Sequence, residues 1–286
     1  MADMDRDRDR HTRRKEERTR YIVAAVLICV AVVAGAVWGV QTYRSRQAER
    51  ELALLAEQSR TDVENTRSGT DVQTEEAVTD SLQALREMGV PIPEKDVDFA
   101  ALQEETNADI YAWIYVPDTQ IDYPIVQHPT DNSYYLNYNL DGSKGYPGCI
   151  YTENYNKKDF SDPNTVIYGH NMKNGSMFAG LHLFEDSEFF EEHPYVYIYT
   201  EDGLLVYEIF AAHQSGNEHI LYTYDFDSDT VYRNYLEDIF ETRSMNSNIR
   251  EDAEVTEENR IITLSTCISS KPNNRYLVQG VLLNED

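Results

Sequence analysis

Residues 260–267 read RIITLSTC, and residues 274–282 read NRYLVQGVL. Both runs are rich in β-branched and apolar residues, which favours two β-strands joined by a short loop. The first strand carries a thiol, Cys267, to its tip, and the second begins with a permanent cation, Arg275. A thiol and a guanidinium at one place are suited to nucleophilic attack on a carbonyl and to stabilisation of the resulting oxyanion.

A histidine upstream completes a candidate catalytic group. Residues 168–172 read YGHNM, so His170 follows a strand-like run and a glycine, where a side chain can face a cleft. A free thiol has a pKa of about 8.5 and is mostly protonated at neutral pH unless a nearby cation favours the thiolate. We expect Cys267 to form a thioester, His170 to exchange protons with the leaving and incoming amines, and Arg275 to hold the oxyanion.

Three neighbours of these residues are predicted to contact the substrate: Ser265, Thr266 and Asn171. Strand alternation puts Ser265 on the same side as Cys267 and Thr266 on the opposite side. The other histidines after the apolar run, His128, His182, His193, His213 and His219, are expected to be structural, with His213 as the reserve acid. Cys149, in the run PGCIY, is expected to be a small buried hydrophobe.

Residues 21–40 form an uncharged apolar run, YIVAAVLICVAVVAGAVWGV. At about 1.5 Å per residue this run is long enough to cross a hydrocarbon core of about 30 Å. The basic residues of the tail that precedes it, residues 1–20, predict a single-pass cell-membrane anchor with a cytoplasmic N-terminus and an extracellular catalytic domain. The alternative is a cleaved signal peptide, because residues 34–36 read AGA; the length of the run favours the anchor.

Charge narrows the possible partners. The chain carries −26; residues 1–20 hold eight Lys/Arg and six Asp/Glu, and residues 21–40 hold none, so residues 41–286 carry −28. Such a domain is repelled by phosphate backbones, which excludes nucleic acid as a partner. The sequence shows no phosphate loop, zinc spacing or calcium loop, and we expect neither a metal nor a cofactor.

The ectodomain divides into a polar stalk or linker, residues 41–70, and a catalytic domain with N-terminal helices, residues 71–286. Helical spacing covers 71–88, and a second helix is expected from Asp98 towards Trp113. Eight short strands then follow, which predict a mainly β barrel or sandwich of roughly 190 residues. The predicted strands are 120–127, 133–138, 149–152, 165–168, 195–200, 204–213, 260–267 and 275–283. Between the sixth and seventh, residues 229–245 predict a long amphipathic helix that closes one side.

In this order, several short strings resemble the sortases, and specifically class B. They run from about Asn107 to Leu283 and include IDYPIVQ (121–127), SYYLN (133–137), VIYGHNM (166–172), GSMF (175–178) and TLSTC (263–267) with Arg275. The resemblance implies a closed eight-stranded sortase-like β-barrel, and it matches Cys267 to the family nucleophile, His170 to its acid/base and Arg275 to its arginine. The connection from Cys267 to Arg275 is short beside some class B members and has no acidic residue directly after the cysteine.

The resemblance implies a cysteine transpeptidase that cleaves a C-terminal sorting motif of secreted proteins and transfers the acyl group to an amine of a cell-wall (peptidoglycan) precursor. A variant is a pilus-polymerising sortase whose acceptor is a pilin lysine. Two other classes remain open: an extracellular cysteine peptidase, in which water replaces the amine, and a catalytically silent binding module. The presence of Cys267, His170 and Arg275 argues against the silent module.

Overall fold

The structure, a computed structural model, describes residues 2–61 and 81–284, and the side chains of residues 2–19 and 60–61 are outside this description. The chain forms two compact units, Met1–Gln47 and Ala48–Asp286. Helix α1 (Ala2–Thr61) supplies the first unit and the beginning of the second. In the described part of the chain, the stretch Arg20–Ser59 is the one helix long and apolar enough to cross a membrane.

The predicted anchor, residues 21–40, lies within α1, and its side chains are exposed, as a lipid-facing segment requires. The helix continues through residues 41–61 of the predicted stalk. Ala48 and Leu52 are buried within the second unit, so this end of α1 belongs to the folded domain. Residues 62–70 of the stalk and 71–80 of the predicted helix lie outside the described residues, whereas residues 81–87 are helical.

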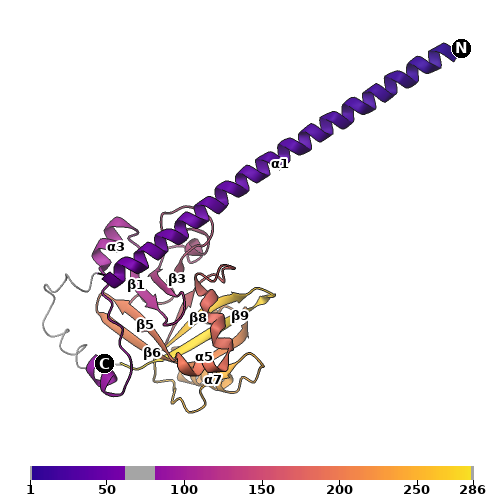
Figure 1. The fold of residues 1–286 in the computed structure, drawn as a ribbon. Coiled ribbons are helices and arrows are strands. Elements are labelled where there is room, and N and C mark those ends of the chain that lie inside the picture. Colours follow the sequence, from indigo (N-terminus) through magenta and orange to yellow (C-terminus); the bar gives the residue numbers. More distant parts are fainter. Residues whose placement is uncertain (1, 62–80, 285–286) are drawn as a thin grey trace. The chain divides into compact units, whose positions relative to one another are not determined.

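The second unit is built around a closed β-barrel (Figure 1). Neighbouring strands follow the order β5-β1-β2-β3-β4-β8-β9-β6-β7, and a further β5–β6 pairing closes a ring of eight strands with β7 at its edge. This ring confirms the predicted mainly β, eight-stranded barrel. The strands are β1 (Ile110–Tyr115), β2 (Asp122–Val126), β3 (Ile150–Thr152), β4 (Asn164–Tyr168), β5 (Tyr195–Thr200), β6 (Gly203–Gly216), β7 (Asn248–Ile249), β8 (Ile261–Ile268) and β9 (Lys271–Leu282).

Strand β8 lies between β4, to which it is parallel, and β9, to which it is antiparallel. Its residues 261–266 are all buried, and Cys267 is the first exposed one. Its buried residues are mostly β-branched or apolar, which explains why the sequence predicted a strand here. The turn between β8 and β9 consists of Ser269 and Ser270, which makes the short connection from Cys267 to Arg275 a tight hairpin.

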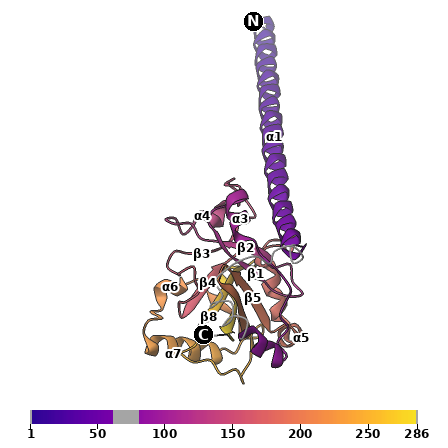
Figure 2. The same cartoon turned by 90° about the vertical axis from the view of Figure 1, so that its left-hand side faces the viewer.

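Helix α7 (Asp229–Phe240) covers the outer face of the barrel beside β4, β6, β8 and β9 (Figure 2). Its buried residues Tyr232, Tyr235, Leu236 and Ile239 form a second apolar cluster with Phe210 and its neighbours. The helix lies between β6 and the cysteine strand, as predicted, but ends five residues early. The Arg243 guanidinium donates to the Phe240 and Thr242 carbonyl oxygens, which satisfies the helix end.

Two predicted elements are wrong. The expected strand at 133–138 contains the short helix α4 (Tyr134–Asn137), because the Asp131 carboxylate accepts from the backbone N–H and hydroxyl of Ser133 and starts a turn. The helix expected towards Trp113 ends as α3 (Phe99–Glu105), and the run IYAWIY forms β1. The remaining helices are η2 (Phe178–Glu185), α5 (Ser187–Glu192) and α6 (Ile220–Thr223).

Candidate active site

The β8–β9 hairpin brings the thiol and the guanidinium together. Cys267 and Arg275 are directly opposite each other in the antiparallel register. Residues paired in this way project to the same face, with Cβ atoms about 4.5–5.5 Å apart. Cys267 is an exposed free thiol, and the half-buried Arg275 anchors one end of its guanidinium by donating from Nη1 to the carbonyl oxygens of Pro272 (3.2 Å) and Asn274 (3.0 Å).

His170 reaches the same end of the barrel through β4. Tyr168 of β4 pairs with Ser265 of β8, so His170 and Cys267 each stand two residues beyond this pair on parallel neighbours. The Nε2 atom of His170 lies 2.7 Å from the Leu136 carbonyl oxygen. This oxygen can only accept, so Nε2 carries the proton and Nδ1 of the neutral ring is left to exchange protons with a substrate.

Gly169, directly before His170, lets the backbone pack closely against the side chains of Ile150 and Phe178. A Cβ atom at Gly169 would lie 2.5 Å from Ile150 Cδ1 and 2.7 Å from Phe178 Cγ. The Gly169 N–H donates to the Ser265 carbonyl, and the Thr266 hydroxyl donates to the Gly169 carbonyl at 2.8 Å. The backbone that carries His170 is therefore bound to the strand that carries the thiol.

Two neutral tyrosines border the group. Burial raises the pKa of Tyr151 above its ordinary value; the charges of Glu153 and Cys267 raise it further, and Arg275 opposes them. Burial likewise raises the pKa of Tyr168, which Arg275 also opposes. Both phenols stay protonated near neutral pH and lie within electrostatic reach of the site.

The three residues predicted to contact the substrate differ in their burial and hydrogen bonds. Ser265 and Thr266 are buried, and the Thr266 hydroxyl is already engaged with the backbone. The Asn171 side chain turns to the Cys267 carbonyl oxygen, 2.9 Å from its Nδ2 atom. A substrate contact by any of the three stays a prediction.

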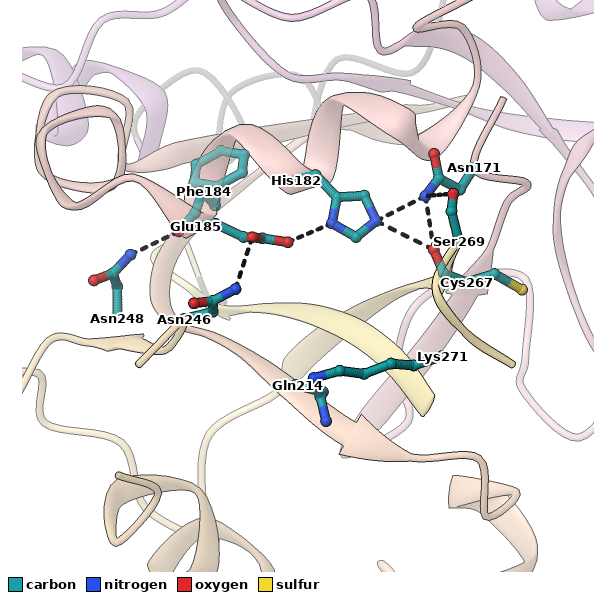
Figure 3. A network of polar contacts seen from close by, with 10 residues as sticks. All are labelled: Asn171, His182, Phe184, Glu185, Gln214, Asn246, Asn248, Cys267, Ser269 and Lys271. Atoms are coloured by element: carbon teal, nitrogen blue, oxygen red, sulfur yellow. Dashed lines mark hydrogen bonds and ion pairs between the residues drawn. The ribbon is translucent and has the colours of Figure 1, made fainter. Parts of the chain in front are cut away.

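One histidine expected to be structural lies beside the site. His182 of η2 places Nε2 3.1 Å from the Cys267 carbonyl oxygen and Nδ1 2.6 Å from Glu185 (Figure 3). The sequence offered one signal for this pair, since His182 and Glu185 are three residues apart and therefore share a helix face. The reserve acid His213 is buried and bound to Gln279, and burial lowers its pKa.

The second ectodomain cysteine is enclosed in the folded domain. Cys149 is buried, burial raises its pKa, and its thiol lies against the Tyr138 carbonyl oxygen. Among the described residues no group of three His, Cys, Asp or Glu side chains could hold a metal. A cavity of about 470 Å³ is lined by Arg260, at the opposite end of β8 from Cys267, and one of about 500 Å³ is lined by Met245.

The chain is similar to known proteins over most of the barrel. A family model described as the sortase domain matches residues 114–283. Sortase B of Listeria monocytogenes is 38% identical over 186 residues, which are 64% of this chain and 73% of that protein. The X-ray structure of Clostridium perfringens sortase B matches with a TM-score of 0.58 and 32% identity, covering 65% of this chain and 99% of that one. The Staphylococcus aureus sortase B–substrate complex matches with a TM-score of 0.58 and 26% identity, covering 74% and 95%.

Proposed function

Because the chain belongs to the sortase family, in class B, whose members are cysteine transpeptidases, we propose that it anchors secreted proteins at the cell surface. Its substrate is the C-terminal sorting motif of a secreted protein. Its acceptor is an amine of a cell-wall precursor. The observation that carries this proposal is the cross-strand pair of Cys267 and Arg275, with His170 at the matching position beyond β4.

The first half-reaction forms a thioester. His170 Nδ1 takes the proton of the Cys267 thiol, and the resulting thiolate attacks a backbone carbonyl of the motif. The guanidinium of Arg275 stabilises the oxyanion of the tetrahedral intermediate. His170 gives a proton to the leaving amine, which departs with the C-terminal part of the substrate. The Leu136 carbonyl supports this role because it binds one ring nitrogen and leaves the other for the transfer.

The second half-reaction releases the product. The incoming amine attacks the thioester, His170 accepts its proton, and the Cys267 thiolate leaves as the new amide forms. Arg275 stabilises the second oxyanion as it did the first. No metal or redox step enters this scheme, since bond exchange at one carbonyl needs a nucleophile, a proton carrier and an oxyanion donor.

The N-terminal helix supports a membrane location for this chemistry. We assign residues 21–40 as the anchor, residues 1–20 to the cytoplasm and the catalytic domain to the cell exterior. In this orientation the site faces secreted proteins as they emerge. Protease added to intact protoplasts is expected to digest the catalytic domain, and protection of the domain would contradict the orientation.

The test compares products with and without acceptor. Purified full-length protein in detergent is incubated with a library of sorting-motif peptides, alone and with an added amine, and the products are identified by mass spectrometry. The proposal predicts an amide between the cleaved motif and the amine, formed faster than the hydrolysed peptide. Hydrolysis unaffected by amine would instead indicate a cysteine peptidase. A preference for a lysine side chain in a pilin peptide over a cell-wall peptide would indicate the pilus-polymerising variant.

A further inference from the structure

The backbone carbonyl of Cys267 accepts a hydrogen bond from a side chain outside its own strand, and a second side chain lies beside it. Asn171 Nδ2 and His182 Nε2 lie 2.9 and 3.1 Å from its oxygen. The β8–β9 ladder changes register directly after Cys267, so these contacts occur where regular strand pairing is interrupted. Figure 3 shows the sulfur pointing away from His182, whose ring faces the carbonyl oxygen instead.

The chemistry of the donors and acceptors orders these groups into a chain. A carbonyl oxygen can only accept, so the nitrogen of the Asn171 amide must face Cys267. The same amide nitrogen lies 2.9 Å from His182 Nε2 and 3.4 Å from the Ser269 hydroxyl oxygen. Its second hydrogen is directed to the nearer His182 Nε2, which accepts it when Nε2 carries no proton. His182 Nδ1 is then protonated and donates to Glu185 Oε1 at 2.6 Å.

Further contacts hold His182 and Glu185, two members of this hydrogen-bond chain, in place. The His182 ring stacks on the buried Tyr276, the residue after Arg275, with ring centroids 5.1 Å apart. Glu185 Oε2 accepts a hydrogen bond of 3.0 Å from Asn246. The carboxylate and the imidazole therefore have little freedom to turn away from the Asn171 amide.

We propose that Asn171, His182 and Glu185 are positioning residues for the nucleophile. Glu185 fixes the tautomer of His182, His182 orients the Asn171 amide, and this amide holds the Cys267 carbonyl so that the thiol stays opposite Arg275. Both amide hydrogens of Asn171 are used in this way, which leaves only Oδ1 for a substrate. The inference rests on the proposed function, because its main consequence is measured on peptide cleavage.

The first test removes and then restores the acceptor for the Asn171 amide. His182→Ala is expected to lower kcat about tenfold, the effect of one hydrogen bond of about 1.4 kcal/mol, with KM within about twofold. His182→Gln places an amide oxygen within reach of Asn171 and is expected to recover most of the rate. The kcat of Asn171→Ala should match that of His182→Ala. The double variant should be no slower than either single variant, since all three break the same hydrogen-bond chain.

His193→Ala is the matched control. The His193 side chain is 22% exposed, as is that of His182; it pairs with Asp118 at 3.1 Å and lies against Phe189, but it does not contact the site. Its kcat is expected to equal that of the wild type. A folded His182→Ala enzyme with wild-type kcat would overturn the proposal, as would a rise in KM alone or a His182→Gln enzyme as slow as His182→Ala. If His182→Ala does not fold, Asn171→Ala gives the same test.

A substrate-free measurement separates this inference from the proposed function. The amide N–H offsets the partial negative charge of the carbonyl beside the thiolate, so alkylation of Cys267 by iodoacetamide at neutral pH should slow about threefold in His182→Ala. It should not change in His193→Ala. Equal alkylation rates in all three proteins would contradict the positioning role. A wild type that alkylates normally but cleaves no peptide would contradict the proposed function alone.

Discussion

Replacement of Arg275 by lysine separates the charge of the arginine from its geometry. In the structure Nη1 donates to the carbonyl oxygens of Pro272 and Asn274, which fixes the plane of the guanidinium opposite Cys267. Within the described residues the N–H groups on Nε and Nη2 make no hydrogen bond, so they are available to a substrate oxygen. Lysine keeps the charge but has a single nitrogen, which cannot both hold two carbonyls and bind the oxyanion in a fixed direction.

The expected fall in kcat of Arg275→Lys follows from the loss of one oxyanion donor. Such losses lower kcat by about 10²–10³, which at about 1.4 kcal/mol per tenfold is about 3–4 kcal/mol of transition-state stabilisation. The charge develops only in the transition state, so KM is expected to change much less than kcat. Stability should fall by only about 1 kcal/mol, because the hydrogen bonds lost from the fold are those to two backbone carbonyls.

The assay is steady-state cleavage of a fluorogenic motif peptide, with Arg233→Lys as the control. Arg233 lies on α7 and pairs with Glu257 at the protein surface, so this variant should keep the wild-type kcat. A wild-type kcat for Arg275→Lys would refute the oxyanion role. A loss confined to KM would make Arg275 a substrate-binding residue.

The remaining predictions concern the proton carrier, the backbone and the core. His170→Ala should lower kcat by about 10²–10⁴ without recovery at high pH, because the leaving amine still needs a proton; recovery would make His170 only an activator of the thiol. Gly169→Ala should destabilise the fold by about 1–3 kcal/mol in urea unfolding, since its Cβ would lie 2.5 Å from Ile150 Cδ1, and an unchanged urea midpoint would contradict this packing. Burial lowers the pKa of His213 below its ordinary value, so the unfolded state binds the proton more readily and stability is lost as pH falls below about 6.5. The urea midpoint should therefore fall less between pH 7 and pH 5 in His213→Gln than in the wild type, and an equal fall would exclude this residue as a cause.

Strands of the barrel were predictable where β-branched and apolar residues follow one another. The cysteine strand β8 is such a segment, rich in β-branched residues, and its buried part ends directly before Cys267. The amphipathic spacing of α7 was equally clear, because only one of its faces packs on the barrel. In both cases the burial leaves a pattern in the residues of the element itself, which the sequence shows.

The errors arose where local chemistry or long-range pairing decided the outcome. Tyrosines at 134 and 135 suggested a strand, but the Asp131 carboxylate accepts hydrogen bonds from Ser133 and starts a turn directly before α4. Apolar spacing at Ile110 suggested a helix, yet Ile110 pairs with Val126 and its strand with β5. The His182 contact with Cys267 joins residues 85 apart in sequence, which no local pattern encodes.

The central claim is that Cys267 carries the acyl group, and rapid-quench mass spectrometry tests it directly. A sorting-motif peptide is mixed with the enzyme without amine, quenched in acid and digested, and the modified residue is located. The account predicts a hydroxylamine-sensitive thioester on Cys267 that is absent from Cys267→Ala and fully retained in Cys149→Ala, because the Cys149 thiol is buried. Acylation of any other residue, or turnover by Cys267→Ala above a few per cent of the wild type, would contradict it.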